Sequence, residues 1–132
     1  MLSRTISSLP DETEGIIYKI IGCAIEVHTR LSAGYVEAVY HKAMCIELQH
    51  QGLSFETERR VDIRYRDHVI HSHRVDLVVG QQVVLELKAV DRLTDVHRAQ
   101  VVSYLRALKV RVGLLMNFNT DHLKGSIKRV VV

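Results

Sequence analysis

The chain is organised around the segment Arg74-Val75-Asp76-Leu77-Val78-Val79-Gly80-Gln81-Gln82-Val83-Val84-Leu85-Glu86-Leu87-Lys88. Two apolar runs flank a short turn that contains a glycine, which predicts two neighbouring β-strands. Strand interiors seldom contain charged residues, yet four occur here. Side chains alternate between the two faces of a strand, so Arg74 and Asp76 share one face of the first strand. By the same rule, Glu86 and Lys88 share one face of the second strand.

The length of the turn determines whether these charged faces coincide. A three-residue loop of Gly80, Gln81 and Gln82 would place Asp76 directly opposite Glu86. A two-residue loop would separate the two carboxylates, because a slip of one residue turns every side chain to the other face. The apolar pattern favours the three-residue loop, which gathers six side chains on one face: Val75, Leu77, Val79, Val83, Leu85 and Leu87.

Two carboxylates directly opposite each other on paired strands repel. A divalent cation between Asp76 and Glu86 would remove the repulsion, and carboxylate oxygens are the ligands that Mg²⁺ takes. The alternative interpretation is a set of diagonal salt bridges that join Arg74 to Glu86 and Asp76 to Lys88. The pattern of these two strands leaves both interpretations open.

The bulk composition is that of one globular domain. The chain has 132 residues, of which 47% are hydrophobic and 25% are charged. Its net charge of +3 permits a polyanionic partner without requiring one. We expect no membrane span, because no run of 18 apolar residues is present. Cys23 and Cys45 lack metal-ligand spacing, so we predict reduced thiols and a cytoplasmic protein.

The remaining patterns predict an α/β fold in which a mixed central β-sheet is flanked by α-helices. Residues 1–11 are expected to be a flexible leader, and residues 12–132 a single domain. The predicted helices cover residues 12–30, 35–51 and 95–108, the last capped by Thr94, with one helical turn at 123–126. The predicted strands, besides the central pair, cover residues 54–63, 111–118 and 127–132; residues 69–73 form either a separate strand or the start of the Arg74 strand.

Several polar residues have a structural as well as a functional interpretation. Glu37 falls in the first turn of a predicted helix, where the helix dipole favours a solvated acid. His71 and His73 have the spacing of a metal pair, but without further ligands we expect them to be solvated. Gln100 and Tyr104 lie four apart and therefore on one helical face.

Taken together, these residues resemble the PD-(D/E)xK nuclease superfamily. The ordered set is Glu37, Asp76, Glu86-Leu87-Lys88 and Gln100-x-x-x-Tyr104, and it is similar to the RecB-type and lambda-exonuclease-like branch. The heptad Gly34-Tyr35-Val36-Glu37-Ala38-Val39-Tyr40 looks like the signature of the small GxxExxY family. The resemblance extends from Ile16 to Val132. It departs at Val75, where the superfamily pattern has a proline.

The resemblance implies a restriction-endonuclease-like core and a site for Mg²⁺ or Mn²⁺. Asp76, Glu86 and the backbone carbonyl of Leu87 would bind the ion, and Glu37 would reach it directly or through water. Lys88 would orient or deprotonate the attacking water. Gln100 and Tyr104 would line the site from the third helix. For Tyr40, one turn after Glu37, we favour a packing or orienting role.

Two functions follow as hypotheses. The first is a metal-dependent nuclease that hydrolyses phosphodiester bonds of nucleic acid, DNA rather than RNA. The second is a non-catalytic nucleic-acid-binding or assembly module that keeps the nuclease fold. So small a unit is expected to need a homo-oligomer or a partner protein to hold its substrate. The apolar end Val130-Val131-Val132 is a candidate edge strand for such pairing.

Overall fold

The computed structural model describes residues 8–132, and the predicted order of elements is confirmed. Along the chain the elements are α1 (Asp11–Leu31), α2 (Glu37–His50), β1 (Phe55–Tyr65), β2 (His68–Val79), β3 (Val83–Lys88), α3 (Asp95–Leu108), β4 (Val112–Asn117), the 3₁₀ turn η1 (Leu123–Ser126) and β5 (Ile127–Val131). Thr94 caps α3 as predicted, since its side chain accepts a hydrogen bond from the backbone N–H of His97.

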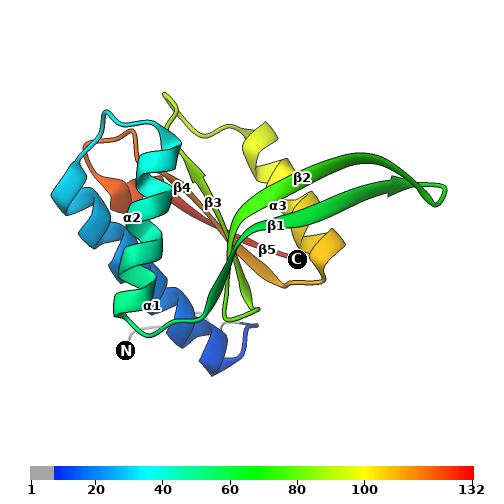
Figure 1. Ribbon diagram of the computed structural model, residues 1–132, viewed down its shortest axis with the longest axis horizontal. Helices are drawn as coiled ribbons and strands as arrows, with labels where there is room; N and C mark the ends of the chain where they lie inside the picture. The colour runs from blue at the N-terminus through cyan, green and yellow to red at the C-terminus, as the bar shows by residue number, and fades with distance from the viewer. Residues whose placement is uncertain (1–7) are drawn as a thin grey trace, which may run out of the picture.

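The strands form one five-stranded sheet in the order β1-β2-β3-β4-β5. Only β3 and β4 are parallel, and α3 makes the crossover between them; the other neighbours are antiparallel. Helices α1 and α2 lie against one face of the sheet, and α3 lies against the other (Figure 1). This is the predicted mixed α/β fold, consistent with a restriction-endonuclease-like core.

Each face of the sheet has its own hydrophobic cluster. The cluster beneath α1 and α2 includes Ile17, Ile20, Tyr40, Met44, Leu77, Leu85, Leu87 and Leu114. The cluster beneath α3 includes Val61, Val75, Val78, Val84, Val101, Tyr104, Leu105 and Leu115. Strand β4 contributes to both clusters and is buried along its whole length, which explains its almost continuous apolar sequence.

The predicted three-residue loop between β2 and β3 is confirmed. Val79 pairs with Val83, and the ladder continues to Leu77 and Leu85, where it ends. The prediction for Val75 is wrong, because its side chain belongs to the cluster beneath α3 rather than to that of Leu77. The alternation of faces is therefore interrupted at Asp76. The partner strand is irregular at the same level, because the β1–β2 ladder omits the pair Glu58 and Asp76.

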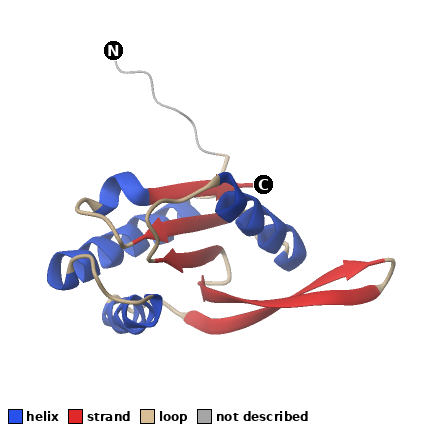
Figure 2. Ribbon diagram, turned by 90° about the horizontal axis from the view of Figure 1, so that it is seen from above, coloured by secondary structure: helices blue, strands red, loops and turns tan. Residues whose placement is uncertain are grey.

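Beyond this interruption, β2 leaves β3 and pairs with β1 alone. The two strands continue as a twisted two-stranded ribbon that projects past α3 (Figure 2). Residues 69–73 are part of β2 and not a separate strand. We call residues 60–74 the arm.

The ends of the chain differ in part from expectation. Residues 1–7 of the predicted leader lie outside the described residues, whereas Leu9 is buried in the cluster beneath α1 and α2. The second helix begins two residues later than predicted, at Glu37, and Val36 just before it is exposed. At the other end, β5 pairs with β4 only and forms one edge of the sheet. Within the described chain, no helix combines the length and the apolar character needed to cross a membrane.

Gly113 allows α3 to lie close to β4, and we predict that Gly113→Ala destabilises the fold. A Cβ atom there would come within 2.8 Å of Val101 Cγ1 and 3.4 Å of the Val84 carbonyl oxygen. Valine is stiff at χ1, so the helix or the strand must shift, at a cost of about 1–3 kcal/mol. Denaturant unfolding measures this change.

Gly22→Ala is the matched control, because a Cβ at this exposed position on α1 meets nothing within 4 Å. Alanine in a helix interior is more favourable than glycine by about 0.5–1 kcal/mol, so this variant should be as stable as wild type or more so. Equal unfolding free energies for Gly113→Ala and wild type would contradict the close-packing argument.

Candidate active site

Asp76 and Glu86 meet where β2 separates from β3. The backbone N–H of Leu87 donates to Asp76 Oδ2 over 2.7 Å, and the backbone N–H of Asp76 donates to Glu86 Oε1 over 3.2 Å. Each carboxylate thus takes the place of a backbone carbonyl of the facing strand. These two bonds continue the β2–β3 connection past the end of the ladder. The strands stay linked while both carboxyl groups are brought to one point.

Burial and mutual repulsion act on both acids. Glu86 is 4% exposed, and its pKa rises from the ordinary 4.5 to about 8, mainly because burial disfavours its charge and secondly because Asp76 lies near. Burial also raises the pKa of Asp76, and the hydrogen bond from the Leu87 N–H offsets only part of that rise. The positive charge of Lys88 lowers the pKa of both groups without reversing either shift. Among the described residues, no ion pair joins Arg74 to Glu86 or Asp76 to Lys88, so the diagonal salt-bridge interpretation is not supported.

Lys88 is the last residue of β3, half-buried, and the chain around it is fixed on both sides. Its carbonyl accepts from the N–H of Phe118 over 2.8 Å. The buried side chain of Asn117 then bonds both the N–H and the carbonyl of Val90, at 3.0 and 2.9 Å. Neighbouring strand β4 therefore holds the segment that follows the lysine.

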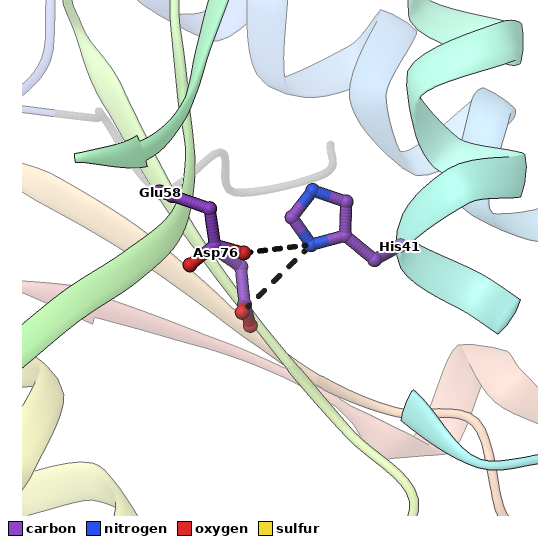
Figure 3. Close-up of side chains that lie close together, drawn as sticks. All are labelled: His41, Glu58 and Asp76. Atoms are coloured by element: carbon purple, nitrogen blue, oxygen red, sulfur yellow. Dashed lines mark ion pairs between the residues drawn. The ribbon is translucent and has the colours of Figure 1, made fainter. Parts of the chain in front are cut away.

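On the α2 side, two residues that the sequence analysis did not single out join Asp76. His41 Nδ1 lies 3.9 Å from Asp76 Oδ1 and 3.8 Å from Glu58 Oε1 (Figure 3). Donor atoms of His41, Glu58 and Asp76 all lie within 4.8 Å of one another. Glu58 has a φ of 53° in the middle of β1, a left-handed conformation that costs a non-glycine residue about 1–3 kcal/mol. Such strain is most often found at functional positions.

A local sequence signal existed for His41 but not for Glu58. His41 comes four residues after Glu37 and therefore shares its helical face. Glu58 reaches the site only through the β1–β2 pairing, which no local pattern reveals. Glu37 is the exposed first residue of α2 and lines the same hollow of about 550 Å³ as His41, Glu58 and Asp76.

The heptad around Glu37 is held in place by Tyr40. Its hydroxyl donates to the carbonyl of Ser32 over 2.6 Å, and its fully buried ring stacks on Phe118 with centroids 4.6 Å apart. Gly34 has a φ of 117°, which an L side chain rarely adopts. Tyr40 and Gly34 together fix the turn that begins α2. The packing role expected for Tyr40 is confirmed.

On the α3 side, Tyr104 reaches the pair but Gln100 does not. Tyr104 is buried, and its pKa is raised first by that burial and then by the charges of Glu86 and Asp76. Its ring stacks on His73 at 4.2 Å with an interplanar angle of 5°. Gln100 is exposed one turn earlier, and no hydrogen bond among the described residues links it to the other predicted site residues. Its role stays a prediction.

His73 differs from the solvated histidine that we expected. The ring packs between strand and helix, and its Nε2 lies 3.8 Å from Glu86 Oε1. That nitrogen is buried and has no hydrogen-bond partner within residues 8–132, and desolvation lowers the pKa of the ring. His71 is exposed, as expected for a solvated histidine.

The donor set fits a divalent cation. Asp76 and Glu86 bring two carboxyl groups together with insufficient positive charge nearby, and His41 and Glu58 add an imidazole nitrogen and a third carboxylate. Carboxylates suit both Mg²⁺ and Mn²⁺, and an imidazole ligand shifts the preference toward Mn²⁺. Asp76 is the residue common to both groups of ligands.

Comparison with known proteins gives one family and one fold relative. The family model described as "PD-(D/E)XK nuclease superfamily" matches residues 14–130. The solved structure described as "Crystal structure of SSO0001" matches with a TM-score of 0.55 and 17% identity, over 71% of this chain and 48% of that one. The present chain thus spans about half the length of that protein, and the likeness shows the fold alone. No curated protein matches the sequence.

We predict that the metal-free protein loses stability as the pH rises from 4.5 to about 8. Over this range the unfolded chain releases the Glu86 proton while the folded chain keeps it, so folding is progressively penalised. Glu86→Gln removes the ionisation, and above a pH of about 8 this variant should melt at a higher temperature than wild type in EDTA. Below pH 4.5 the two should melt alike.

Asp121→Asn, at an exposed loop position, is the matched acid-to-amide control and should follow wild type at every pH. If Glu86→Gln and wild type melt at the same temperature at every pH, burial of the ionised Glu86 does not destabilise the fold.

We also predict that Asp76→Asn abolishes binding of Mn²⁺, measured by titration calorimetry, and that His41→Ala weakens it about tenfold or more. Asp76 is shared by both ligand groups, and His41 contributes a nitrogen that Mn²⁺ accepts. His50→Ala, at an exposed position on the same helix, should bind like wild type. Unchanged affinity in His41→Ala would exclude the imidazole from the ligand set.

Proposed function

The chain belongs to the PD-(D/E)XK nuclease superfamily, and we propose that it hydrolyses phosphodiester bonds of nucleic acid, with DNA as the expected substrate and Mg²⁺ or Mn²⁺ as the cofactor. The observation that supports this most directly is the pairing of Asp76 and Glu86, each bonded to the backbone of the other strand, with Lys88 following on β3. A buried carboxyl group beside a half-buried one is costly for a fold, and a metal-dependent reaction gives the pair a use.

Asp76, Glu86 and Glu37 are the side chains proposed to hold the ion, with His41 and Glu58 as further candidates. The Leu87 carbonyl is also proposed, because the N–H of Leu87 points toward Asp76 and both groups of a strand residue face the same neighbour. When bound, the ion supplies positive charge that activates water and stabilises the phosphate.

The chain's own residues would prepare the reactants. Lys88 would donate a hydrogen bond to the attacking water or to a phosphate oxygen, which orients one against the other. Tyr104, fixed by its stack on His73, would keep bulk water from the α3 side of the carboxylate pair. Gln100, one turn away on the exposed face of α3, would contact the substrate backbone.

Other features stay as predictions within this proposal. Membership of the GxxExxY family and of the RecB-type branch rests on the Gly34–Tyr40 heptad and the ordered site residues. A cytoplasmic location, a homo-oligomer or partner protein, and the domain boundary near residue 12 remain expectations from sequence.

The test is cleavage of labelled single- and double-stranded DNA, and of RNA, with Mg²⁺, Mn²⁺ or EDTA. We expect metal-dependent cleavage by wild type that Lys88→Ala slows by about 100-fold or more, the usual range for losing a positioned proton-transfer group. Lys88 is half-buried at a strand end, so melting curves of the variant establish that the fold survives.

Lys19→Ala, an exposed lysine on α1, is the matched control and should cleave like wild type. Absence of cleavage by wild type on every substrate and metal would overturn the nuclease proposal and favour the non-catalytic binding or assembly module.

A further inference from the structure

The arm is larger than the core of the protein requires. Its base packs on α3 through Val61 and the His73–Tyr104 stack, next to the buried Val75. Beyond that base, residues 64–71 are all exposed and contribute nothing to either hydrophobic cluster. An isolated two-stranded ribbon is at best marginally stable in water. The outer half of the arm is therefore better explained by what it contacts outside the protein.

The arm carries more arginines than acids, and two of these arginines face each other across the strand pair, where they destabilise it. It contains four arginines and two aspartates: Arg60, Arg64, Arg66 and Arg74, with Asp62 and Asp67. Arg60 and Arg74 are direct partners in the β1–β2 ladder, and like charges directly opposite each other destabilise a strand pair. Asp62 forms an ion pair with Arg60 at 2.8 Å and so offsets that charge. Arg74 is exposed. Within the described residues, neither Arg74 nor Arg64 takes part in an ion pair.

The arm is also continuous with the candidate active site. Arg74 comes two residues before Asp76, and strand alternation places both on the face opposite the buried Val75. From Asp76 back to the start of β2 at His68, the strand extends about 25 Å at the usual rise per residue. A polyanion that lies along the ribbon would meet its arginines over that length and arrive at the carboxylate pair. At the tip, the Arg66 guanidinium lies 6.0 Å over the Tyr65 ring.

We propose that the arm binds duplex DNA, with its arginines on the phosphate backbone and the ribbon directed into the major groove. A B-form major groove is about 12 Å wide and admits a two-stranded ribbon, whereas that of an RNA duplex is too narrow for side chains to enter. The inference rests on the proposed nuclease function and specifies its substrate class as double-stranded DNA.

The experiment is fluorescence anisotropy with a labelled DNA duplex of about 20 base pairs, roughly two turns, at several salt concentrations in EDTA. We compare wild type with Arg64→Ala/Arg74→Ala. Each lost phosphate contact lowers the slope of log affinity against log salt by about one, so the double variant should lose about two. Neither substitution breaks an ion pair between described residues, and melting curves check the fold.

Lys19→Ala/Lys124→Ala is the control with the same loss of charge. Both lysines are exposed, Lys19 on α1 and Lys124 on η1, and neither belongs to the arm. This variant should keep the wild-type slope. A single strand and an RNA duplex of equal length should bind more weakly than the DNA duplex and respond less to the arginine substitutions.

Three results would overturn the proposal: an unchanged slope in the arginine variant, an equal loss in the lysine control, or arm-dependent binding of the RNA duplex as tight as that of DNA. Because binding is measured without metal, the two proposals fail separately. Arm-dependent binding by a protein that cleaves nothing would remove the nuclease function only. Cleavage of DNA by a protein whose arginine variant keeps the wild-type slope would remove the arm's role only.

Discussion

The structure depends on two hydrogen bonds that cross the point where β2 and β3 part, one from the Asp76 N–H to the Glu86 carboxylate and one from the Leu87 N–H to the Asp76 carboxylate. The two side chains replace the backbone groups that would otherwise continue the ladder. Because side-chain carboxylates accept these two hydrogen bonds, β2 and β3 remain joined at the point where their backbones move apart. The same hydrogen bonds bring a buried and a half-buried acid together, and burial raises the pKa of both.

Three layers of the fold meet at this point. From one face of the sheet, α2 brings Glu37 and His41, positioned by the buried ring and hydroxyl of Tyr40. From the other face, α3 brings Tyr104 against His73 and the far side of the pair. The strands thus separate an acidic side, which lines a hollow next to α2, from a side covered by the His73–Tyr104 stack. The hollow beside the carboxylates therefore opens on the α2 side.

The arm and the candidate active site have a common structural origin. Once β2 no longer pairs with β3, it can pair only with β1, and a free two-stranded ribbon twists strongly. The irregularity at Glu58 in β1 lies opposite Asp76 in β2. The same local distortion of the two strands therefore positions the Asp76 carboxylate and marks the start of the arm. The position of the candidate active site at the base of a basic ribbon is therefore a consequence of one break in the sheet.

The sequence by itself determined the order of the elements, the three-residue loop, the meeting of Asp76 with Glu86 and the packing of Tyr40. These follow from apolar periodicity and short-range pairing, which are local properties. Tertiary structure alone decided that Val75 turns toward α3, that Glu58 and His41 join Asp76, and that His73 is stacked and not solvated. Each of these depends on how far β2 and β3 stay paired and on which helix covers each face. That outcome depends on contacts between residues distant in the chain, and no window of sequence contains it.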